Sequence, residues 1–350
     1  MNKHLIALAV TAATLSGAAS AAQVYSDDTS SLAIGGRVEA RALLSEQAEN
    51  NLVAPTLQKT ENEVTDISRV RVNIDAKTQI ADGVQGIGFY EREFKDDNSD
   101  DENRYMYAGV NSDQYGQIVY GKADGSLGML TDFTDIMAYA GSVVGGTKLA
   151  VADRTTNNLA YTGNFGDLTF KANYVFSGAD YDTAGNKTDV HGFSTGAVYK
   201  VADTGLALGA GYGEQRDQNG VNTHKARSEQ TFATASYTMG DLYFGGLYKS
   251  GRRDGKNLVT DAVTDTQGYE FAAAYTMGKT VFTTTYGFMK DENAHNVYDE
   301  LANAAAVDAT YYFNSNFRTY ASYTFNMLDK NKVGKVAASD EFVLGARYDF

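Results

Sequence analysis

Residues 69–80 read Arg-Val-Arg-Val-Asn-Ile-Asp-Ala-Lys-Thr-Gln-Ile, a stretch in which polar and apolar side chains alternate. Successive side chains of a β-strand point to opposite faces, so this period of two predicts a strand with one apolar and one polar face. The apolar face carries Val70, Val72 and Ile74, and the polar face carries Arg69 and Arg71.

The same alternation recurs along most of the chain. It is clear in residues 32–44, 168–174, 206–212, 242–248, 269–275, 282–288, 307–313 and 342–350. Counting every segment of this kind gives about sixteen strands. The chain is therefore predicted to be all-β, with no helical domain.

The connections between these segments alternate in length. Short turns rich in Gly, Asn and Asp, such as residues 81–83, 239–241 and 277–279, are typical of tight hairpins. Between them lie long polar loops, such as residues 45–64, 177–189 and 250–266. Short turns on one side and long loops on the other are typical of a transmembrane β-barrel.

A stack of soluble β-sandwiches is the alternative architecture. It would place the apolar faces in a core, whereas here those faces are rich in Tyr, Phe and Leu, often at strand ends, as in an aromatic girdle facing lipid. A tilted strand of about 10 residues spans roughly 23 Å, which matches the apolar band of such barrels. We therefore predict a 16-stranded antiparallel transmembrane β-barrel over residues 22–350, with its polar faces lining a water-filled lumen.

Composition excludes several classes of function. The 350 residues carry a formal charge of −14, which argues against a nucleic-acid partner because phosphate binding needs a basic surface. The absence of Cys excludes thiol catalysis, Cys-ligated zinc and disulfides. One Pro against 35 Gly and 24 Tyr suits many strands joined by glycine turns. No cofactor and no metal site is predicted.

The first 21 residues have the pattern of a secretory signal peptide. Lys3 and His4 precede an apolar run over residues 5–15, and small residues lead to Ala21. This arrangement predicts cleavage after Ala21. The alternative is a buried helix or a membrane anchor, but the apolar run is shorter than the roughly 20 residues that a spanning helix needs.

Several motifs resemble those of a known family. Residues 35–41 (Gly-Gly-Arg-Val-Glu-Ala-Arg), residues 66–71 (Asp-Ile-Ser-Arg-Val-Arg) and the terminal residues 347–350 (Arg-Tyr-Asp-Phe) resemble general porins of the Gram-negative outer membrane. Residues 120–125 and 131–139 are similar to the OmpU-like porins. The resemblance implies a general diffusion porin for ions and small hydrophilic solutes, which forms a homotrimer in outer-membrane lipid and lipopolysaccharide and folds its third loop inward.

Candidate residues of a charged constriction follow from the alternation and from this resemblance. The alternation directs the side chains of Arg37, Arg41, Arg69 and Arg71 into the lumen. The resemblance implies that Glu91, Arg104 and Arg154 also face inward. For Arg104 and Arg154, a solvated charge pair at the surface is the alternative interpretation.

The longest connection, residues 122–155, is moderately apolar, as expected of a loop that packs against the barrel wall. It carries Asp124, Asp132 and Asp135, which we expect to face the arginines. The Pro-Glu-Phe-Gly-Gly motif of the family is replaced by residues 138–141, Ala-Tyr-Ala-Gly, so no second loop carboxylate is assigned. Opposed arginines and carboxylates, together with the acidic excess, predict electrostatic sieving with a mild cation preference.

Two other kinds of function are alternatives for such a barrel. An enzyme needs a positioned nucleophile and base, yet only three His follow the signal segment. A substrate-specific channel or a surface adhesin built on the same barrel is the remaining alternative. A sugar channel would line its lumen with aromatic rings, and most Tyr and Phe are in the outward register, although Tyr243, Tyr312 and Tyr320 are not.

Overall fold

The computed structural model describes residues 21–48, 53–57, 59–96, 101–178, 180–181, 187–219, 224–256, 261–293 and 297–350. Its strands are β1 (Ala22–Ser26), β2 (Ser30–Ala48), β3 (Thr60–Asp66), β4 (Arg69–Ala81), β5 (Val84–Lys95), β6 (Glu102–Ser112), β7 (Gly116–Ala123), β8 (Thr155–Phe165), β9 (Leu168–Val175), β10 (Asp180–Tyr181), β11 (Lys187–Val201), β12 (Leu206–Asn219), β13 (His224–Met239), β14 (Leu242–Lys256), β15 (Asp261–Met277), β16 (Thr280–Asn293), β17 (Tyr298–Tyr312), β18 (Phe317–Asn326) and β19 (Glu341–Asp349). The helices are short: α2 (Gly128–Thr131), the 3-10 turn η1 (Ala150–Ala152) and α3 (Lys330–Val333).

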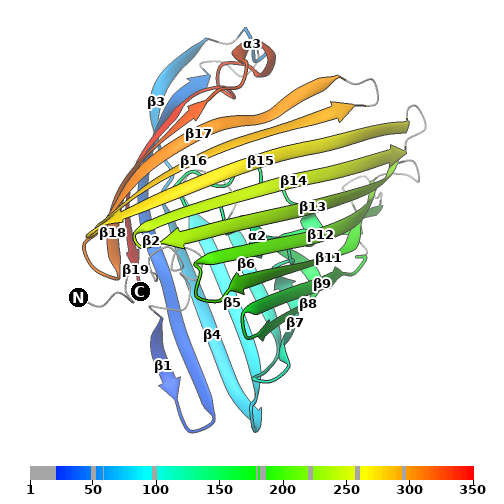
Figure 1. Ribbon diagram of the computed structural model, residues 1–350, viewed down its shortest axis with the longest axis vertical. Helices are drawn as coiled ribbons and strands as arrows, with labels where there is room; N and C mark the ends of the chain where they lie inside the picture. The colour runs from blue at the N-terminus through cyan, green and yellow to red at the C-terminus, as the bar shows by residue number, and fades with distance from the viewer. Residues whose placement is uncertain are drawn as a thin grey trace.

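The strands form one closed antiparallel barrel (Figure 1). Neighbours in sequence pair with each other all the way round, and β19 closes the circle by pairing with β2, where Asp349 lies opposite Arg37. The prediction of a 16-stranded antiparallel barrel is confirmed. The additional strands β1, β3 and β10 are short pieces that extend this wall along β2 and β11.

Two-residue turns connect several hairpins at one end of the barrel, as the sequence predicted. Between β13 and β14, Gly240 has φ of 60°, and between β15 and β16, Gly278 has φ of 61°. A side chain at this positive φ would be strained, so glycine sets the tight reversal at both places.

The two faces of the wall differ as the alternation predicted. On β2, Val38 is 48% exposed on the outside, whereas its neighbour Glu39 is 1% exposed on the inside. On β4, Ile74 is 38% exposed and its neighbour Asn73 is 2% exposed. The outer surface is therefore apolar and open, and the inner surface carries the polar side chains.

Aromatic side chains gather on the outer surface near both ends of the strands. Tyr311, Phe313 and Phe317 are neighbours near the β17–β18 turn, with ring centroids 4.8 and 5.4 Å apart along the series. Toward the opposite ends of the same wall, the rings of Tyr323 and Phe325 lie 4.6 Å apart. Two aromatic belts of this kind mark the boundaries of a membrane-spanning apolar band.

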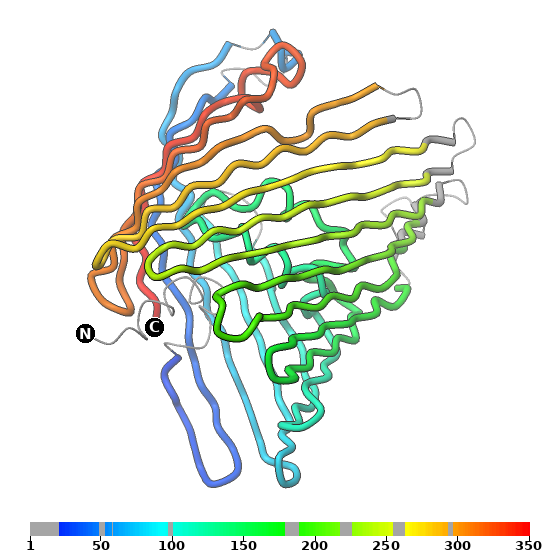
Figure 2. Tube along the Cα trace, in the orientation of Figure 1, coloured from blue at the N-terminus to red at the C-terminus, as the bar shows by residue number. Residues whose placement is uncertain are grey.

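Within the described ranges, no helix is long and apolar enough to cross a membrane. The connection between β7 and β8, residues 124–154, folds into the barrel, and we call it the inner loop. Figure 2 shows this part of the trace within the outline of the barrel, away from the ends of the strands.

Candidate functional site

The inner loop is held inside the barrel by apolar contacts with the wall. Leu127, Leu130 and Val144 of the loop are fully buried and form one cluster with wall side chains, among them Phe232 and Leu247. A loop exposed to water would not bury such side chains, so the moderately apolar composition of this connection is explained by its position.

Polar wall side chains then fix the backbone of the inner loop at successive points. Each accepts a hydrogen bond from a loop N–H group: Asn173 from Ser126 (3.1 Å), Gln215 from Val151 (3.2 Å), Gln230 from Leu149 (3.0 Å), Glu270 from Val144 (2.8 Å) and Asp308 from Ala138 (2.6 Å). The acceptors stand on β9, β12, β13, β15 and β17. The loop therefore crosses from its own side of the barrel to the opposite wall.

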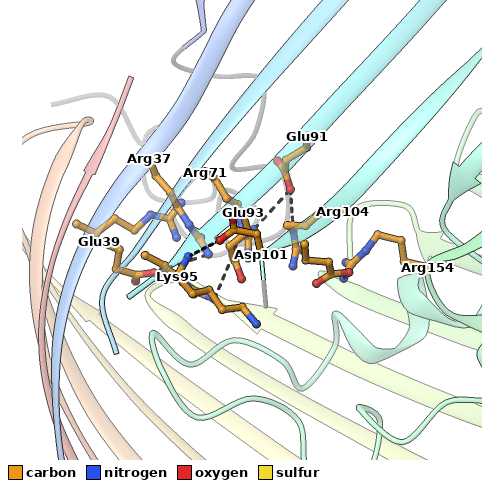
Figure 3. Close-up of polar contacts among 12 residues, drawn as sticks. Arg37, Glu39, Arg71, Glu91, Glu93, Lys95, Asp101, Arg104 and Arg154 are labelled. Carbon is orange, nitrogen blue, oxygen red and sulfur yellow. Dashed lines mark hydrogen bonds and ion pairs between the residues drawn. The ribbon is translucent and has the colours of Figure 1, made fainter. Parts of the chain in front are cut away.

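A separate part of the wall, formed by β2, β4, β5 and β6, carries a chain of alternating charges (Figure 3). Its ion pairs, in order, are Arg37–Glu39 (3.7 Å), Glu39–Arg69 (2.7 Å), Arg69–Glu93 (3.5 Å), Glu93–Arg71 (2.5 Å), Arg71–Glu91 (3.9 Å) and Glu91–Arg104 (2.7 Å). Four arginines are thus interleaved with three glutamates, and we call this set the charge ladder.

The charge ladder is shielded from bulk water. The side chains of Glu39, Glu91 and Glu93 are between 1% and 8% exposed, and that of Arg37 is 9% exposed. Glu39 also accepts a hydrogen bond from the hydroxyl of Tyr320 at 3.0 Å. Charges this buried persist because each one has an opposite charge within reach.

The remaining candidate arginines flank the charge ladder. Arg41 donates from Nε to the carbonyl of Ile67 at 3.2 Å, and its guanidinium lies 5.6 Å from the ring centre of Tyr139 on the inner loop. Arg154 pairs with Glu102 at 2.9 Å and lies 5.3 Å from the ring centre of Tyr105. Both arginines therefore link the wall to the inner loop or to its root.

The three candidate aspartates of the inner loop occupy different surroundings. Asp135 lines a cavity of about 280 Å³ together with Arg37, Arg69, Arg318 and Arg347 of the wall. Asp124 lies elsewhere, at the beginning of the loop, where it accepts a hydrogen bond from the hydroxyl of Tyr105 at 2.9 Å.

The pKa values of Asp132 and Asp135 are both raised. The side chain of Asp132 is exposed to the lumen, and desolvation by the surrounding barrel raises its pKa to about 6. The nearby ammonium of Lys171 acts in the opposite direction, and Asp135 adds a further rise. The same loss of bulk water raises the pKa of Asp135.

Several lumen residues were missed by the sequence-based selection of candidates. Glu93 is the acid shared by two ladder arginines, and Arg318 and Arg347 both lie within reach of Asp349, at 3.6 and 2.5 Å. The sequence does indicate that these side chains face the lumen. Glu93 continues the register of Glu91, and Arg347 lies between outward residues of the last strand. Strict use of the period of two would have included them.

Comparisons with known proteins agree with this geometry. The sequence profile described as Gram-negative porin matches residues 7–331. The chain belongs to the Gram-negative porin family. Porin-like protein L of Photobacterium profundum is 56% identical and outer membrane protein U of Vibrio parahaemolyticus is 43% identical, each over 100% of both chains.

Solved porin structures share the fold. The OmpF structure of Salmonella typhi, in complex with daunomycin, superposes with a TM-score of 0.75 at 22% identity, covering 94% of this chain and 100% of that one. The trimer form of OmpT from Vibrio cholerae gives 0.69 at 21% identity, covering 92% and 100%. This porin is therefore an outer-membrane β-barrel that forms a general diffusion channel for small hydrophilic solutes. The family and the relatives point to a channel.

Proposed function

We propose that the channel is narrowed to a charged constriction between the inner loop and the arginine-bearing wall, and that this constriction prefers cations mildly. The observation that carries the proposal is the cavity of about 280 Å³, which Asp135 lines from the loop and Arg37 and Arg69 line from the wall. Opposite charges across a wet neck produce a transverse field, which polar solutes and ions can follow and bulky apolar solutes cannot.

The direction of the preference follows from the charge balance. In the charge ladder each arginine already has a glutamate partner, so the wall presents little net positive charge to a passing ion. Asp132 and Asp135 have no ion-pair partner within 4 Å in the described residues, and the chain as a whole carries −14. These two loop carboxylates are exposed and unpaired, so they add negative charge that a passing cation can meet, which favours cations.

A reversal-potential measurement tests this assignment. The double variant Asp132→Asn and Asp135→Asn should move the zero-current potential in a KCl gradient toward that of an unselective pore. The matched control is Asp203→Asn at the β11–β12 turn, far along the chain from the inner loop. An unchanged potential in the double variant would show that these aspartates do not set selectivity.

We also propose that three copies of the chain assemble in the membrane. On the outer wall of β2, β18 and β19, small residues, among them Ala40, Ala42, Ala321 and Ala346, line a hollow of about 860 Å³. The carboxylate of Asp66 lies at its edge, exposed on a face that otherwise meets lipid. A charge facing lipid is unfavourable, so a partner subunit is the better cover for this part of the wall.

The rest of the outer wall, with its two aromatic belts, supports contact with outer-membrane lipid and lipopolysaccharide. Gel electrophoresis of unheated and heated samples tests the assembly. The expected result is an oligomer that dissociates only on heating, and a monomer under both conditions would contradict it. If this wall is the interface, replacing Asp66 by Ala should disrupt the oligomer. An intact oligomer in this variant would show that the interface lies elsewhere.

Residues 1–21 are proposed to be a signal peptide that is removed on export. Residues 1–20 lie outside the described part of the chain, and β1 begins at Ala22, the first residue after the expected cleavage site. The mass and N-terminal sequence of the protein from isolated outer membranes test this. A chain beginning at Ala22 is expected, and one that retains Met1 would contradict the proposal.

A further inference from the structure

A group of aromatic side chains faces the lumen away from the constriction. Phe89 on β5 lies opposite Tyr107 on β6, and Tyr105 lies opposite Glu91, in the register of the charge ladder. The rings of Phe89 and Tyr107 are stacked with centroids 5.6 Å apart, and Tyr105 meets both rings edge-on at 5.8 and 6.3 Å. We call these three residues the aromatic shelf.

The aromatic shelf borders a second cavity of about 250 Å³. Tyr105 and Tyr107 line it, with Asp124 and Ser126 from the beginning of the inner loop, and polar side chains from β7, β8 and β9 complete it. Asp124 and Ser126 line this cavity at the beginning of the inner loop, whereas Asp135 and Tyr139, nearer its middle, line the cavity of the proposed constriction. The two cavities share no lining residue.

Polar side chains with free hydrogen-bonding capacity surround the shelf. The side chains of Gln117, Thr162 and Lys171 line the cavity, and among the described residues none of them makes a hydrogen bond or an ion pair. Asp124 accepts one bond, from the hydroxyl of Tyr105, and keeps its other oxygen. The cavity therefore offers donors and acceptors on several sides of an aromatic surface.

This combination suits a neutral polyhydroxyl solute. A few polar groups placed around aromatic side chains are the usual makeup of a small-molecule site. The face of an aromatic ring carries partial negative charge, which attracts the C–H face of a sugar ring, while the surrounding groups bind its hydroxyls. We propose that the aromatic shelf is a weak binding subsite for a monosaccharide in the lumen.

The charges of the cavity argue against ionic ligands. Its lining holds one basic and one acidic side chain, Lys171 and Asp124. The nearby Arg104 and Arg154 already pair with Glu91 and Glu102, at 2.7 and 2.9 Å. The lining therefore has no net charge that would favour an organic cation or an anion over a neutral solute.

Single-channel recording in planar bilayers tests the subsite, which rests on the proposed channel function. D-glucose is titrated at constant KCl, with polyethylene glycol of similar mass as the probe for size and viscosity alone. The wild-type current is expected to fall and saturate with glucose but not with polyethylene glycol. Tyr107→Ala should raise the half-saturating glucose concentration at least about fivefold, as expected when one stacking ring is lost.

Two matched variants separate binding from structure. Tyr107→Phe keeps the ring and should retain the wild-type titration, and Tyr199→Ala removes an outward tyrosine that is 48% exposed on β11 and should do the same. An identical response to glucose and polyethylene glycol, or an unchanged titration in Tyr107→Ala, would overturn the subsite. Saturation by tetramethylammonium instead of glucose would overturn the ligand class. A protein that forms no channel at all would refute the channel function itself.

Discussion

Replacing Glu93 by Gln is expected to shift the selectivity of the pore away from cations. Glu93 is the acid shared by Arg71 and Arg69, at 2.5 and 3.5 Å, and its side chain is only 4% exposed. The charge ladder contains four arginines and three glutamates, a balance of +1, so the variant leaves +2. Two guanidinium groups then lose their shared partner.

The size of the effect follows from the electrostatics of a wet lumen. One elementary charge about 5 Å from a passing ion in water contributes roughly 0.8 kcal/mol. Screening at about 0.1 M salt, where the Debye length is roughly 10 Å, reduces this to about 0.5 kcal/mol. That energy lowers cation occupancy and raises anion occupancy about twofold each, so the cation-to-anion permeability ratio should fall by roughly twofold to fivefold.

The assay is the zero-current potential across a planar bilayer with a KCl gradient at neutral pH. Glu300→Gln is the control, because Glu300 is an exposed acid near the end of β17 and lies outside the charge ladder. Glutamine keeps the shape of the side chain, so an oligomer in unheated samples on gels should confirm that the variant is assembled. A permeability ratio equal to the wild-type value in an assembled variant would refute the idea that the wall glutamates neutralise the arginines.

Three further predictions concern the inner loop and the closure of the barrel. Because the pKa of Asp132 is raised to about 6, its carboxylate loses its charge as the pH falls through that value. The cation preference should therefore decline between pH 7.5 and pH 5. The same decline in Asp132→Asn would show that another group causes it. Glu270→Ala removes the acceptor of a buried loop N–H, which costs about 1–3 kcal/mol of stabilising free energy. The single-channel current of this variant should be noisier, whereas that of Glu270→Gln should not. Equal noise in both variants would contradict the anchoring role. Deleting Phe350 removes its two backbone hydrogen bonds to Gly36, at 2.9 and 3.0 Å. The temperature at which the folded form is lost on gels should therefore fall. An unchanged temperature would show that closure of the barrel does not depend on this residue.

The fold could be predicted from the sequence because the side chain of each wall residue faces either lipid or the lumen. Apolar and polar residues therefore alternate along each strand, and Val70 and Arg71 indicate the two faces of β4. The inward arginines Arg37 and Arg69 followed from the same register. Glycine-containing turns such as the one at Gly240 located the hairpins.

The pairing of charges in the lumen could not be predicted from the sequence in the same way. Which acid meets which base depends on the stagger between strands, so the position of Glu93 between Arg69 and Arg71 appears only once β4 and β5 are in register. The path of the inner loop depends on acceptors such as Glu270, which is distant in sequence. The inward placement of Tyr107 was missed because its segment does not alternate cleanly.

The central claim, a water-filled channel that sieves solutes by size and charge, is tested most directly by reconstituting the purified protein in liposomes. Swelling rates in neutral sugars of increasing mass should fall steadily with size, and planar bilayers should show discrete conductance steps that carry more cations than anions. Liposomes that do not swell, or that swell only with one solute whatever its size, would contradict the account.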